Sequence, residues 1–340
     1  MMQEIRKKAR ERIKNKCRVC PVCNGVVCAG EIPGMGGIGT GISFQNNISA
    51  LARHSLVLRT LHQANDPDTT LELWGRKLAM PVIAAPVGSV ALNLGSDMSD
   101  ADYTKYMIQG CGAVRALGAA GDHTNPEIFR QYMREMSAHK DLAIPFIKPW
   151  SVLKEITARL DMAAEAGIGI CGMDVDGAGL PTLRKNAVPV RVTSEKALAE
   201  AAAEAHKRKM KFIVKGIMSV DEARLAVAAG VDALVVSNHG GRVLDYSQGT
   251  ADALPAIAQA VGKDIVVMMD GGIRSGGDVL KALALGARLV LICRPVMVVI
   301  HGDEANGLPA YFRLIQDQLV QAMRLTGCAD LTSVNGRILV

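Results

Sequence analysis

Residues 211–241 read KFIVKGIMSVDEARLAVAAGVDALVVSNHGG, and this stretch holds one complete strand, helix and strand unit. Lys211–Lys215 and Asp232–Ser237 are short apolar runs that predict strands, and Ser219–Ala229 between them has helical spacing. Gly230 follows as a helix stop. Nearly all-apolar strands on either side of one helix are typical of parallel strands that are buried on both faces.

The same alternation extends in both directions from this unit. From about residue 81 we count eight such units, and this number predicts closure into a (β/α)8 TIM barrel. The expected strands are Pro81–Ala85, Ala113–Leu117, Ala143–Lys148, Ile168–Asp174, Lys211–Lys215, Asp232–Ser237, Asp264–Asp270 and Arg288–Cys293. Further expected helices are Ser194–Lys207, Ala251–Val261 and Gly276–Leu285, the last followed by Gly286 as its stop, with Asp303–Leu325 as a closing helix.

Before the barrel lies an N-terminal Cys- and Gly-rich region, so we divide the chain into residues 1–80 and the barrel of residues 81–340. Residues 1–18 carry eight Lys or Arg against two Glu, which accounts for the whole net charge of +6. The basic run predicts an amphipathic helix with Ile5, Ala9 and Ile13 as its apolar stripe. A solvated helix face explains this charge more simply than a nucleic-acid or anionic partner does.

Composition narrows the class of protein further. With 49% apolar and 21% charged residues the chain is globular. The most apolar stretch, Leu289–Ile300, contains Arg294 and Pro295, so it predicts no membrane span. No apolar segment follows the basic leader, and we therefore expect a cytoplasmic protein without a signal peptide.

Polar side chains follow five successive strands, at the end of a barrel where functional groups gather. They are Asp174, Lys215, Ser237 to Arg242, Asp270 to Arg274, and Cys293 with Arg294. His239 and Arg242 leave one strand end together, as a base and a carboxylate ligand, and Asp174 is in place to orient the imidazole. Lys215 fits either a Schiff-base nucleophile or a fixed positive charge.

A candidate phosphate site follows the next strand. Asp270–Gly277 (DGGIRSGG) opens a helix, and its glycines let backbone N–H groups approach an anion at the helix N-terminus. Arg294 from the neighbouring strand adds a second cation beside Arg274. The alternative is a tight turn that needs glycine for its conformation only.

These residues resemble the FMN-dependent α-hydroxy acid dehydrogenases and oxidases, a family that includes glycolate oxidase and lactate oxidase. The likeness is strongest from Phe212 to Val296 and rests on IVKG (213–216), VSNHGGR (236–242), DGGIR (270–274) and ALALGA (282–287). Pro81–Gly88 is similar to the family's first strand. The resemblance implies oxidation of a small 2-hydroxy acid, of the lactate or glycolate kind, and a homotetramer.

The resemblance also assigns roles to individual residues. It implies His239 as catalytic base, Arg242 as ligand of the substrate carboxylate, Asp174 as partner of His239 and Lys215 as the charge beside the flavin. The flavin ring would contact Pro86, Val87, Gly88 and Ser237, while its ribityl and phosphate groups would be held by Asp270, Gly271, Gly272, Ile273, Arg274, Cys293 and Arg294.

The chain departs from the family at several positions. The family uses two active-site tyrosines, and the tyrosines of this chain, at 103, 106, 132, 246 and 311, match neither. Ile147-Lys148-Pro149-Trp150 stands where the family has a glutamine and then a tyrosine. Gly121 and Gly172 replace hydroxyl residues that contact the flavin.

Four cysteines cluster in the N-terminal region. Cys17, Cys20, Cys23 and Cys28 have the spacing C-x2-C-x2-C-x4-C, close to that of bacterial ferredoxins. The spacing predicts a [4Fe–4S] cluster or a structural zinc, and the alternatives are a disulfide pair or free thiols. A flavin would give a cluster its redox partner, so we favour iron–sulfur and expect electrons to leave through it to a separate carrier protein.

Three other functions compete with hydroxy acid oxidation. A flavin-dependent isomerase or reductase, of the type 2 isopentenyl diphosphate isomerase kind, shares the phosphate signature. A flavin-free aldolase would use Lys215 as its Schiff base. A nucleic-acid or partner-binding module would use the basic leader with a four-cysteine zinc site.

Overall fold

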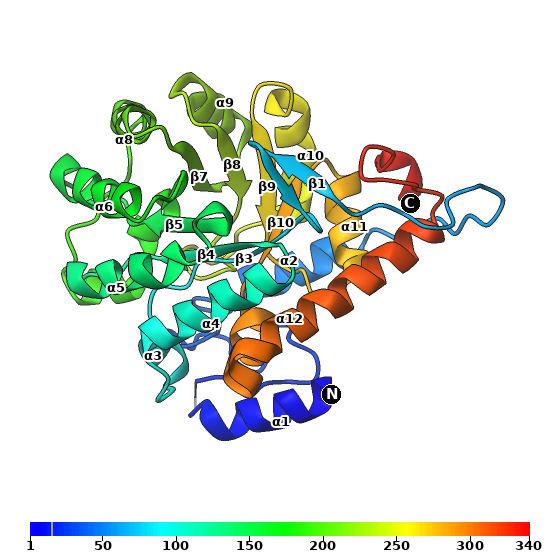
Figure 1. Ribbon diagram of the computed structural model, residues 1–340, viewed down its shortest axis with the longest axis horizontal. Coiled ribbons are helices and arrows are strands. Elements are labelled where there is room, and N and C mark those ends of the chain that lie inside the picture. The colour runs from blue at the N-terminus through cyan, green and yellow to red at the C-terminus, as the bar shows by residue number, and fades with distance from the viewer. Residues whose placement is uncertain (15) are drawn as a thin grey trace.

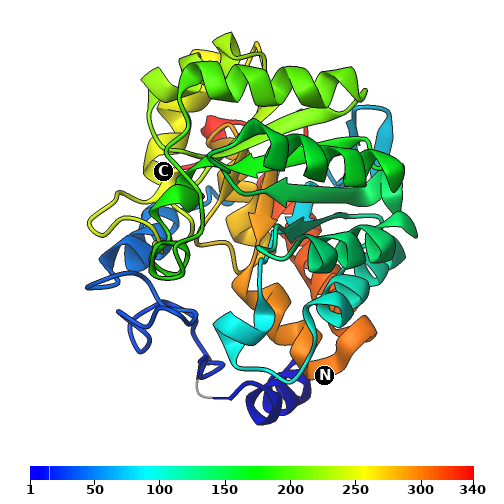
Figure 2. The same ribbon diagram turned by 90° about the vertical axis from the view of Figure 1, so that its left-hand side faces the viewer.

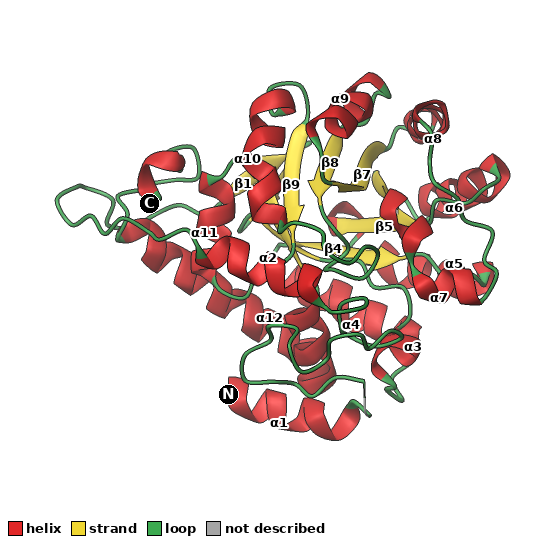
Figure 3. Cartoon of the chain, turned by 180° about the vertical axis from the view of Figure 1, so that it is seen from behind, coloured by secondary structure: helices red, strands yellow, loops and turns green. Residues whose placement is uncertain are grey.

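The computed structural model describes residues 1–14 and 16–340. In this part of the chain, eight parallel strands close into a barrel in the order β10-β3-β4-β5-β6-β7-β8-β9. Figures 1 and 3 show strands of this barrel at the centre of the molecule, with helices around them. They are β3 (Val82–Ala84), β4 (Leu117–Gly121), β5 (Ala143–Ile147), β6 (Ile170–Asp174), β7 (Lys211–Ile217), β8 (Ala233–Val236), β9 (Val266–Asp270) and β10 (Leu289–Ile292). The predicted (β/α)8 barrel is confirmed.

Helices cover the outside of the barrel (Figure 3). They are α4 (Asp100–Ala113), α5 (Pro126–Ser137), α6 (Leu153–Glu165), α8 (Glu195–Lys207), α9 (Val220–Ala228), α10 (Thr250–Val261) and α11 (Gly276–Ala284). Two short helices, α3 (Val90–Leu94) and α7 (Pro181–Lys185), lie in the loops that follow β3 and β6, and the short 3-10 turns are η1 (Lys140–Leu142), η2 (Val175–Gly179) and η3 (Gly336–Ile338). Serine side chains cap α8, α9 and α11, and Gly230 and Gly286 follow α9 and α11 with positive φ, as predicted.

The second predicted strand, Ala113–Leu117, is wrong. Ala113 is the last residue of α4, and β4 begins only at Leu117. β4 consists mostly of glycine and alanine, which have low β propensity. The prediction therefore placed the strand in the preceding residues, 113–117. Close packing explains the small residues, because a Cβ on Gly118 would lie 2.5 Å from the Met107 Sδ of α4.

The closing helix is longer than predicted. α12 spans Arg294–Arg324 and is two helices that meet at a kink, where Asp303 and Glu304 have non-helical backbone angles. The predicted start at Asp303 therefore marks the kink and the second half. The first half begins directly after β10, so Arg294 stands in its first turn.

A hairpin that the sequence did not predict precedes the barrel. β1 (Leu71–Leu73) pairs with β2 (Arg76–Leu78) in an antiparallel sheet. Leu71, Leu73 and Leu78 are buried in the same hydrophobic cluster as Ile83 and the other residues of the barrel interior. The hairpin therefore fills the amino end of the barrel, opposite the strand ends that carry the polar residues.

The N-terminal region packs on the barrel helices. α1 (Met2–Arg12) lies against α12, and Ile5, Ala9 and Ile13 are buried there, as the apolar stripe predicts (Figures 1 and 2). α2 (Ile42–Ala52) packs against α10 and α11. Among the described helices, none is long and apolar enough to cross a membrane.

Candidate active site

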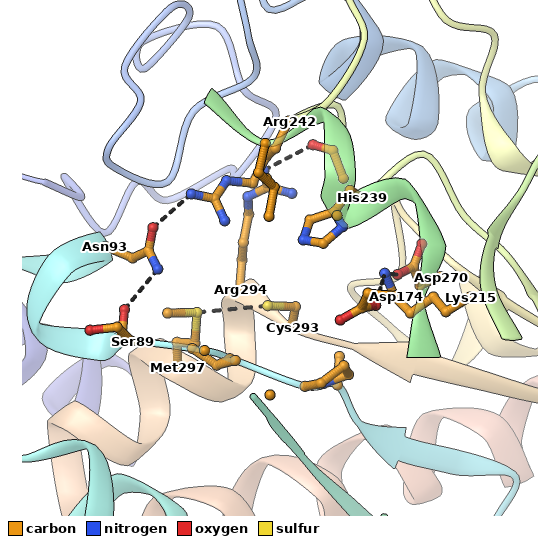
Figure 4. Close-up of a pocket in the computed structure, with 18 of the residues that line it drawn as sticks. Ser89, Asn93, Asp174, Lys215, His239, Arg242, Asp270, Cys293, Arg294 and Met297 are labelled. Carbon is orange, nitrogen blue, oxygen red and sulfur yellow. Dashed lines mark hydrogen bonds and ion pairs between the residues drawn. The ribbon is translucent and has the colours of Figure 1, made fainter. Parts of the chain in front are cut away.

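A cavity of about 490 Å³ opens at the carboxyl ends of the barrel strands. The predicted residues that line it are Pro86, Val87, Gly88, Asp174, Lys215, His239, Arg242, Asp270, Gly271, Gly272, Ile273, Arg274, Cys293 and Arg294. Ser237 does not line it, because its side chain is fully buried and its hydroxyl accepts a hydrogen bond from the His239 backbone N–H at 3.1 Å. Figure 4 shows His239 between Arg242 and the group formed by Lys215, Asp174 and Asp270.

His239 has a different partner from the one predicted. Its Nδ1 lies 3.0 Å from Oδ1 of Asp176, in η2. Asp174 is also close, because one carboxylate oxygen of Asp174, one of Asp176 and one ring nitrogen of His239 all lie within 4.8 Å of one another. However, Asp174 ends β6 beside Lys215 of β7 in the strand register, and it forms its ion pair with that lysine. The prediction that Asp174 partners His239 is therefore wrong.

The turn after β6 brings Asp176 to the imidazole. The sequence signal was the pair Asp174-Val175-Asp176, followed on the next strand by Gly216. Gly216 has φ of 111°, and a Cβ there would lie 2.6 Å from the Asp176 side chain. Burial by itself raises the pKa of Asp176, but His239 and Lys215 outweigh it and lower this pKa. Asp176 is thus an ionised carboxylate that fixes the ring through Nδ1.

Lys215 is a buried cation held by carboxylates. Its side chain is 4% exposed, and its Nζ lies 3.2 Å from Asp174 Oδ1 and 3.5 Å from Asp270 Oδ2. Burial alone lowers the pKa of Lys215, but Asp174, Asp270 and Asp176 outweigh it and raise this pKa. A Schiff-base nucleophile needs the neutral amine. The structure therefore favours the fixed positive charge over the aldolase role.

Arg242 presents an incompletely paired guanidinium to the cavity. One of its terminal nitrogens donates to Asn93 Oδ1 at 2.7 Å and to the Gly34 carbonyl at 3.2 Å. Its Nε is buried without a partner. Burial, together with the nearby Arg294, lowers the pKa of Arg242 to about 10. A bound carboxylate would supply both the missing acceptor and the missing negative charge.

The N-terminus of α11 is partly capped by the protein itself. Ser275 and Asp278 form a capping box, so Asp278 Oδ2 accepts the Arg274 and Ser275 N–H groups, each at 3.0 Å. The Gly276 N–H donates to Gln318 Oε1 at 3.0 Å. These amides are satisfied within the protein, so an anion would meet the turn just before them, where Gly271 and Gly272 have φ of 89° and 82°.

Arg274 is also bonded within the protein. It lines the cavity, but its Nε donates to the Cys23 carbonyl at 3.2 Å and a terminal nitrogen lies 3.6 Å from Cys23 Sγ. Arg294 donates to the Met35 and Gly240 carbonyls, each at 2.9 Å. Its guanidinium stacks on Phe44, 3.7 Å from the ring centroid. Both arginines thus tie the N-terminal region to the barrel.

The cavity fits FMN on several structural grounds. Arg242 and Asp270 line it, and each has a buried polar atom without a partner in the described structure, Nε and Oδ1 respectively. The floor is built from glycines, since a Cβ on Gly121 would lie 2.7 Å from the Gly88 nitrogen. Two cations line the cavity, Lys215 beside Asp174 and Asp270, and Arg294 beside the Gly240 carbonyl. These features match an anionic, flat ligand that approaches backbone closely.

A buried polar network around Asp122 was missed by the sequence reasoning. Asp122 accepts from Arg159 Nε and Trp150 Nε1, each at 2.7 Å, and from the Lys148 backbone N–H at 3.1 Å. The Lys148 ammonium donates to the Asp122 carbonyl. Burial lowers the pKa of Lys148, which lines the cavity. The Lys-Pro-Trp departure was the available signal.

A second missed contact supports the strand end that carries His239. Asn47 of α2 and Asn238 exchange amide hydrogen bonds of 2.8 and 3.1 Å, and Asn47 also accepts a hydrogen bond from the Thr250 N–H.

Of the described residues that line the active-site cavity, none is a tyrosine, which agrees with the absence of the family's two active-site tyrosines from the sequence. The four N-terminal cysteines line a separate cavity of about 360 Å³.

Comparison with known proteins gives consistent matches. A profile of a family described as FMN-dependent dehydrogenase matches residues 34–205 and 133–340. The chain is 32% identical over 322 residues to 4-hydroxymandelate oxidase of Amycolatopsis orientalis, covering 87% of this chain and 89% of that protein. It is 29% identical over 318 residues to L-lactate oxidase of Lactobacillus jensenii, covering 86% and 76%.

Solved structures agree with these matches. A mandelate oxidase variant with 2-hydroxy-phenylacetamide superimposes with a TM-score of 0.79 at 25% identity, covering all of this chain and 97% of that one. A putative lactate oxidase of Pediococcus acidilactici gives 0.79 and 25%, covering all of this chain and 94% of that one.

Proposed function

Because the chain belongs to the FMN-dependent dehydrogenase family, we propose that it oxidises a small 2-hydroxy acid, of the lactate or glycolate kind, to the 2-oxo acid. The observation that carries this proposal is the placement of His239, with its Asp176 partner, in one cavity with Arg242. A base and a carboxylate ligand side by side suit a substrate whose hydroxyl is adjacent to its carboxylate. The names of the relatives above agree with this class of substrate.

Arg242 binds the substrate in this proposal. Its guanidinium is buried, and its Nε has no partner within the protein. A carboxylate placed there gains charge-assisted hydrogen bonds and relieves the repulsion between Arg242 and Arg294. Asn93 accepts from the terminal nitrogen next to Nε, and this contact helps to fix the orientation of the guanidinium.

His239 moves the proton. Its Nδ1 is occupied by Asp176, so Nε2 is the atom that takes the proton of the substrate hydroxyl. The Asp176 carboxylate stabilises the imidazolium that results. The φ of 56° at His239 and the following Gly240 and Gly241 hold the ring at the strand end.

FMN supplies the two-electron acceptor when it is bound. The residues that would hold it are Pro86 to Gly88, Lys215, Asp270 to Ile273, Cys293 and Arg294. Lys215 contributes a positive charge that the raised pKa keeps in place at neutral pH. The amides of Gly271 and Gly272, with Arg294, are the groups suited to the phosphate.

The test is anaerobic titration of the purified protein with lactate, glycolate and mandelate, read by loss of the oxidised flavin absorbance. We expect at least one acid to reduce the flavin, and we expect His239→Gln to slow the reduction by roughly 10²- to 10⁴-fold with unchanged flavin content. If none of these acids, nor any other 2-hydroxy acid in a wider set, reduces wild-type flavin, the proposal fails.

We also propose a cytoplasmic homo-oligomer, tetrameric as the family resemblance implies. All eight cysteines are unpaired in the described structure, which suits a reducing compartment. Size-exclusion chromatography with light scattering gives the mass of the particle, which is compared with the 36.1 kDa of one chain. A monomer at micromolar concentration would contradict the oligomer.

A further inference from the structure

The four N-terminal cysteines surround one cavity. Cys17, Cys20, Cys23 and Cys28 all line the space of about 360 Å³ between the N-terminal segment and α12. None is in a disulfide, and each is partly buried. Four cysteines that line one space together form a ready set of metal ligands.

The spacing of these sulfurs favours a cluster over a single ion. Zinc holds four sulfurs at about 2.3 Å, which places them about 3.8 Å apart in a tetrahedron. In the described residues, no three ligand atoms that include a cysteine come within 4.8 Å of one another. All four cysteines instead line one cavity, and a [4Fe–4S] core needs such a space between its thiolates.

Hydrogen-bond donors and cations lie beside some of these sulfurs. The Val19 N–H donates to Cys17 Sγ at 3.4 Å, and a terminal nitrogen of Arg274 lies 3.6 Å from Cys23 Sγ. Arg294 stands on the same wall, where its charge acts on Cys23 and Cys28. Hydrogen bonds and cations at the sulfurs stabilise the anionic cluster and set its reduction potential.

The loop itself is anchored by arginines of α1. Arg6 donates to the Cys20 carbonyl at 2.8 Å, and Arg10 donates to the Val19 carbonyl at 2.9 Å. These bonds use part of the basic leader to fix the cysteine loop. The leader therefore has a structural role that requires no nucleic acid.

The cysteine cavity and the active-site cavity share a wall. Met35, Arg274 and Arg294 line both of them. Arg294 reaches from the first turn of α12 to the Gly240 carbonyl beside His239, while Arg274 reaches from the glycine turn after β9 to Cys23. A redox centre in each cavity would be separated by little more than these side chains.

We propose that Cys17, Cys20, Cys23 and Cys28 bind a [4Fe–4S] cluster that takes electrons from the flavin site through the wall formed by Arg274 and Arg294. The electron source rests on the proposed function, whereas the cluster site does not. Each substrate loses two electrons and two protons. The cluster accepts the electrons one at a time, passing from the 2+ to the 1+ state, and hands each to an external one-electron carrier protein while the protons go to solvent.

The first test measures composition. Full-length protein is purified without oxygen, and a portion is treated with ferrous iron and sulfide; iron, sulfide, zinc and flavin are then measured on each sample. We expect about four iron and four sulfide per chain and an electron paramagnetic resonance signal after dithionite reduction. One zinc per chain that iron does not replace, or no iron–sulfur absorbance even after treatment, would overturn the cluster.

Matched variants test the ligands and the electron path. The double variant Cys20→Ser with Cys23→Ser should lose the iron and the signal while keeping FMN and its reduction by substrate. Cys328→Ser, a buried cysteine near the C-terminus, is the control and should keep the iron. Retention of iron and sulfide at the wild-type level by the double variant would overturn the ligand assignment.

Electron transfer is read on the same proteins. Substrate alone should produce the reduced-cluster signal in wild type, and the double variant should reduce cytochrome c, used as the one-electron probe, at least tenfold more slowly. Equal rates in both would overturn the electron path. If the wild-type protein holds four iron per chain but no 2-hydroxy acid reduces its flavin, the proposed function is wrong and the cluster assignment is unaffected.

Discussion

At the scale of single residues, the active site depends on which carboxylate meets which cation. Asp174 and Asp176 are two residues apart, yet Asp174 pairs with Lys215 and Asp176 with His239. Strand register decides this, because Asp174 lies beside Lys215 in the sheet while Asp176 is already in the turn beyond it. The two carboxylates therefore have separate tasks, one holding a fixed charge and one orienting a base.

Removal of the Lys215 charge should be costly for stability. Lys215→Met leaves Asp174 and Asp270 buried without their cation, so we expect a loss of about 3–5 kcal/mol in the free energy of unfolding. Lys211→Met on the same strand breaks an ion pair with Asp232 that is half exposed and should cost less than about 1 kcal/mol. Urea unfolding of both variants checks this, and equal losses would contradict it.

The lowered pKa of Asp176 predicts a pH dependence of stability. A carboxyl whose pKa is lower in the folded chain binds fewer protons there than in the unfolded chain. Its stabilising contribution is therefore full above the unfolded value of about 3.9 and is lost as the pH falls through the folded pKa. The difference in unfolding free energy between wild type and Asp176→Asn should therefore shrink as the pH falls below about 4. A difference that grows in acid would refute the assignment.

At the scale of elements, doubly buried strands were the most readable part of the chain. Seven of the eight predicted strands match those observed and the eighth shares only Leu117 with β4, because strands covered on both faces must be apolar along their length. β4 was misplaced because its small residues serve close packing against α4. The β1–β2 hairpin was missed because a three-residue strand carries too little pattern to identify.

The docking of α1 gives a prediction at this scale. A Cβ on Gly302 of α12 would lie 2.2 Å from the Ile5 carbonyl oxygen, so Gly302→Ala should push α1 away and cost about 1–3 kcal/mol. Trypsin should then cut the basic residues of α1 faster. Gly277→Ala on α11 meets only a serine hydroxyl at 3.6 Å, and should be neutral or stabilising by up to about 1 kcal/mol. Unchanged cleavage in Gly302→Ala would show that α1 docks otherwise.

At the scale of the whole molecule, the N-terminal region and the barrel close two adjoining cavities between them. Gly34 and Met35 reach Arg242 and Arg294, and the Ile38 N–H donates to the Gly241 carbonyl at 2.8 Å. Residues that are some 200 positions apart thus complete one wall. A ligand that contacts this wall should therefore stabilise the N-terminal region and the barrel together.

Flavin should therefore raise the melting temperature of the protein. A ligand that binds only the folded chain adds about 2.7 kcal/mol at a concentration 100 times its Kd. Scanning calorimetry of flavin-stripped protein should show a clear increase in melting temperature when FMN is added. Riboflavin, which lacks the phosphate, is the control and should raise it less at equal concentration, because it cannot use Arg294 and the glycine turn. An equal rise with riboflavin would refute the phosphate site.

The sequence by itself determined the barrel, the end at which chemistry gathers and most of the residues found there, because strand burial and strand-end polarity are local properties of the chain. Only the tertiary structure decided the partner of His239, the capped N-terminus of α11 and the wall shared by the two cavities. Each of these depends on strand register or on contacts between distant segments. Which of two neighbouring carboxylates or amides forms a given hydrogen bond depends on distances of a few ångströms, and these distances are set only when the chain is folded.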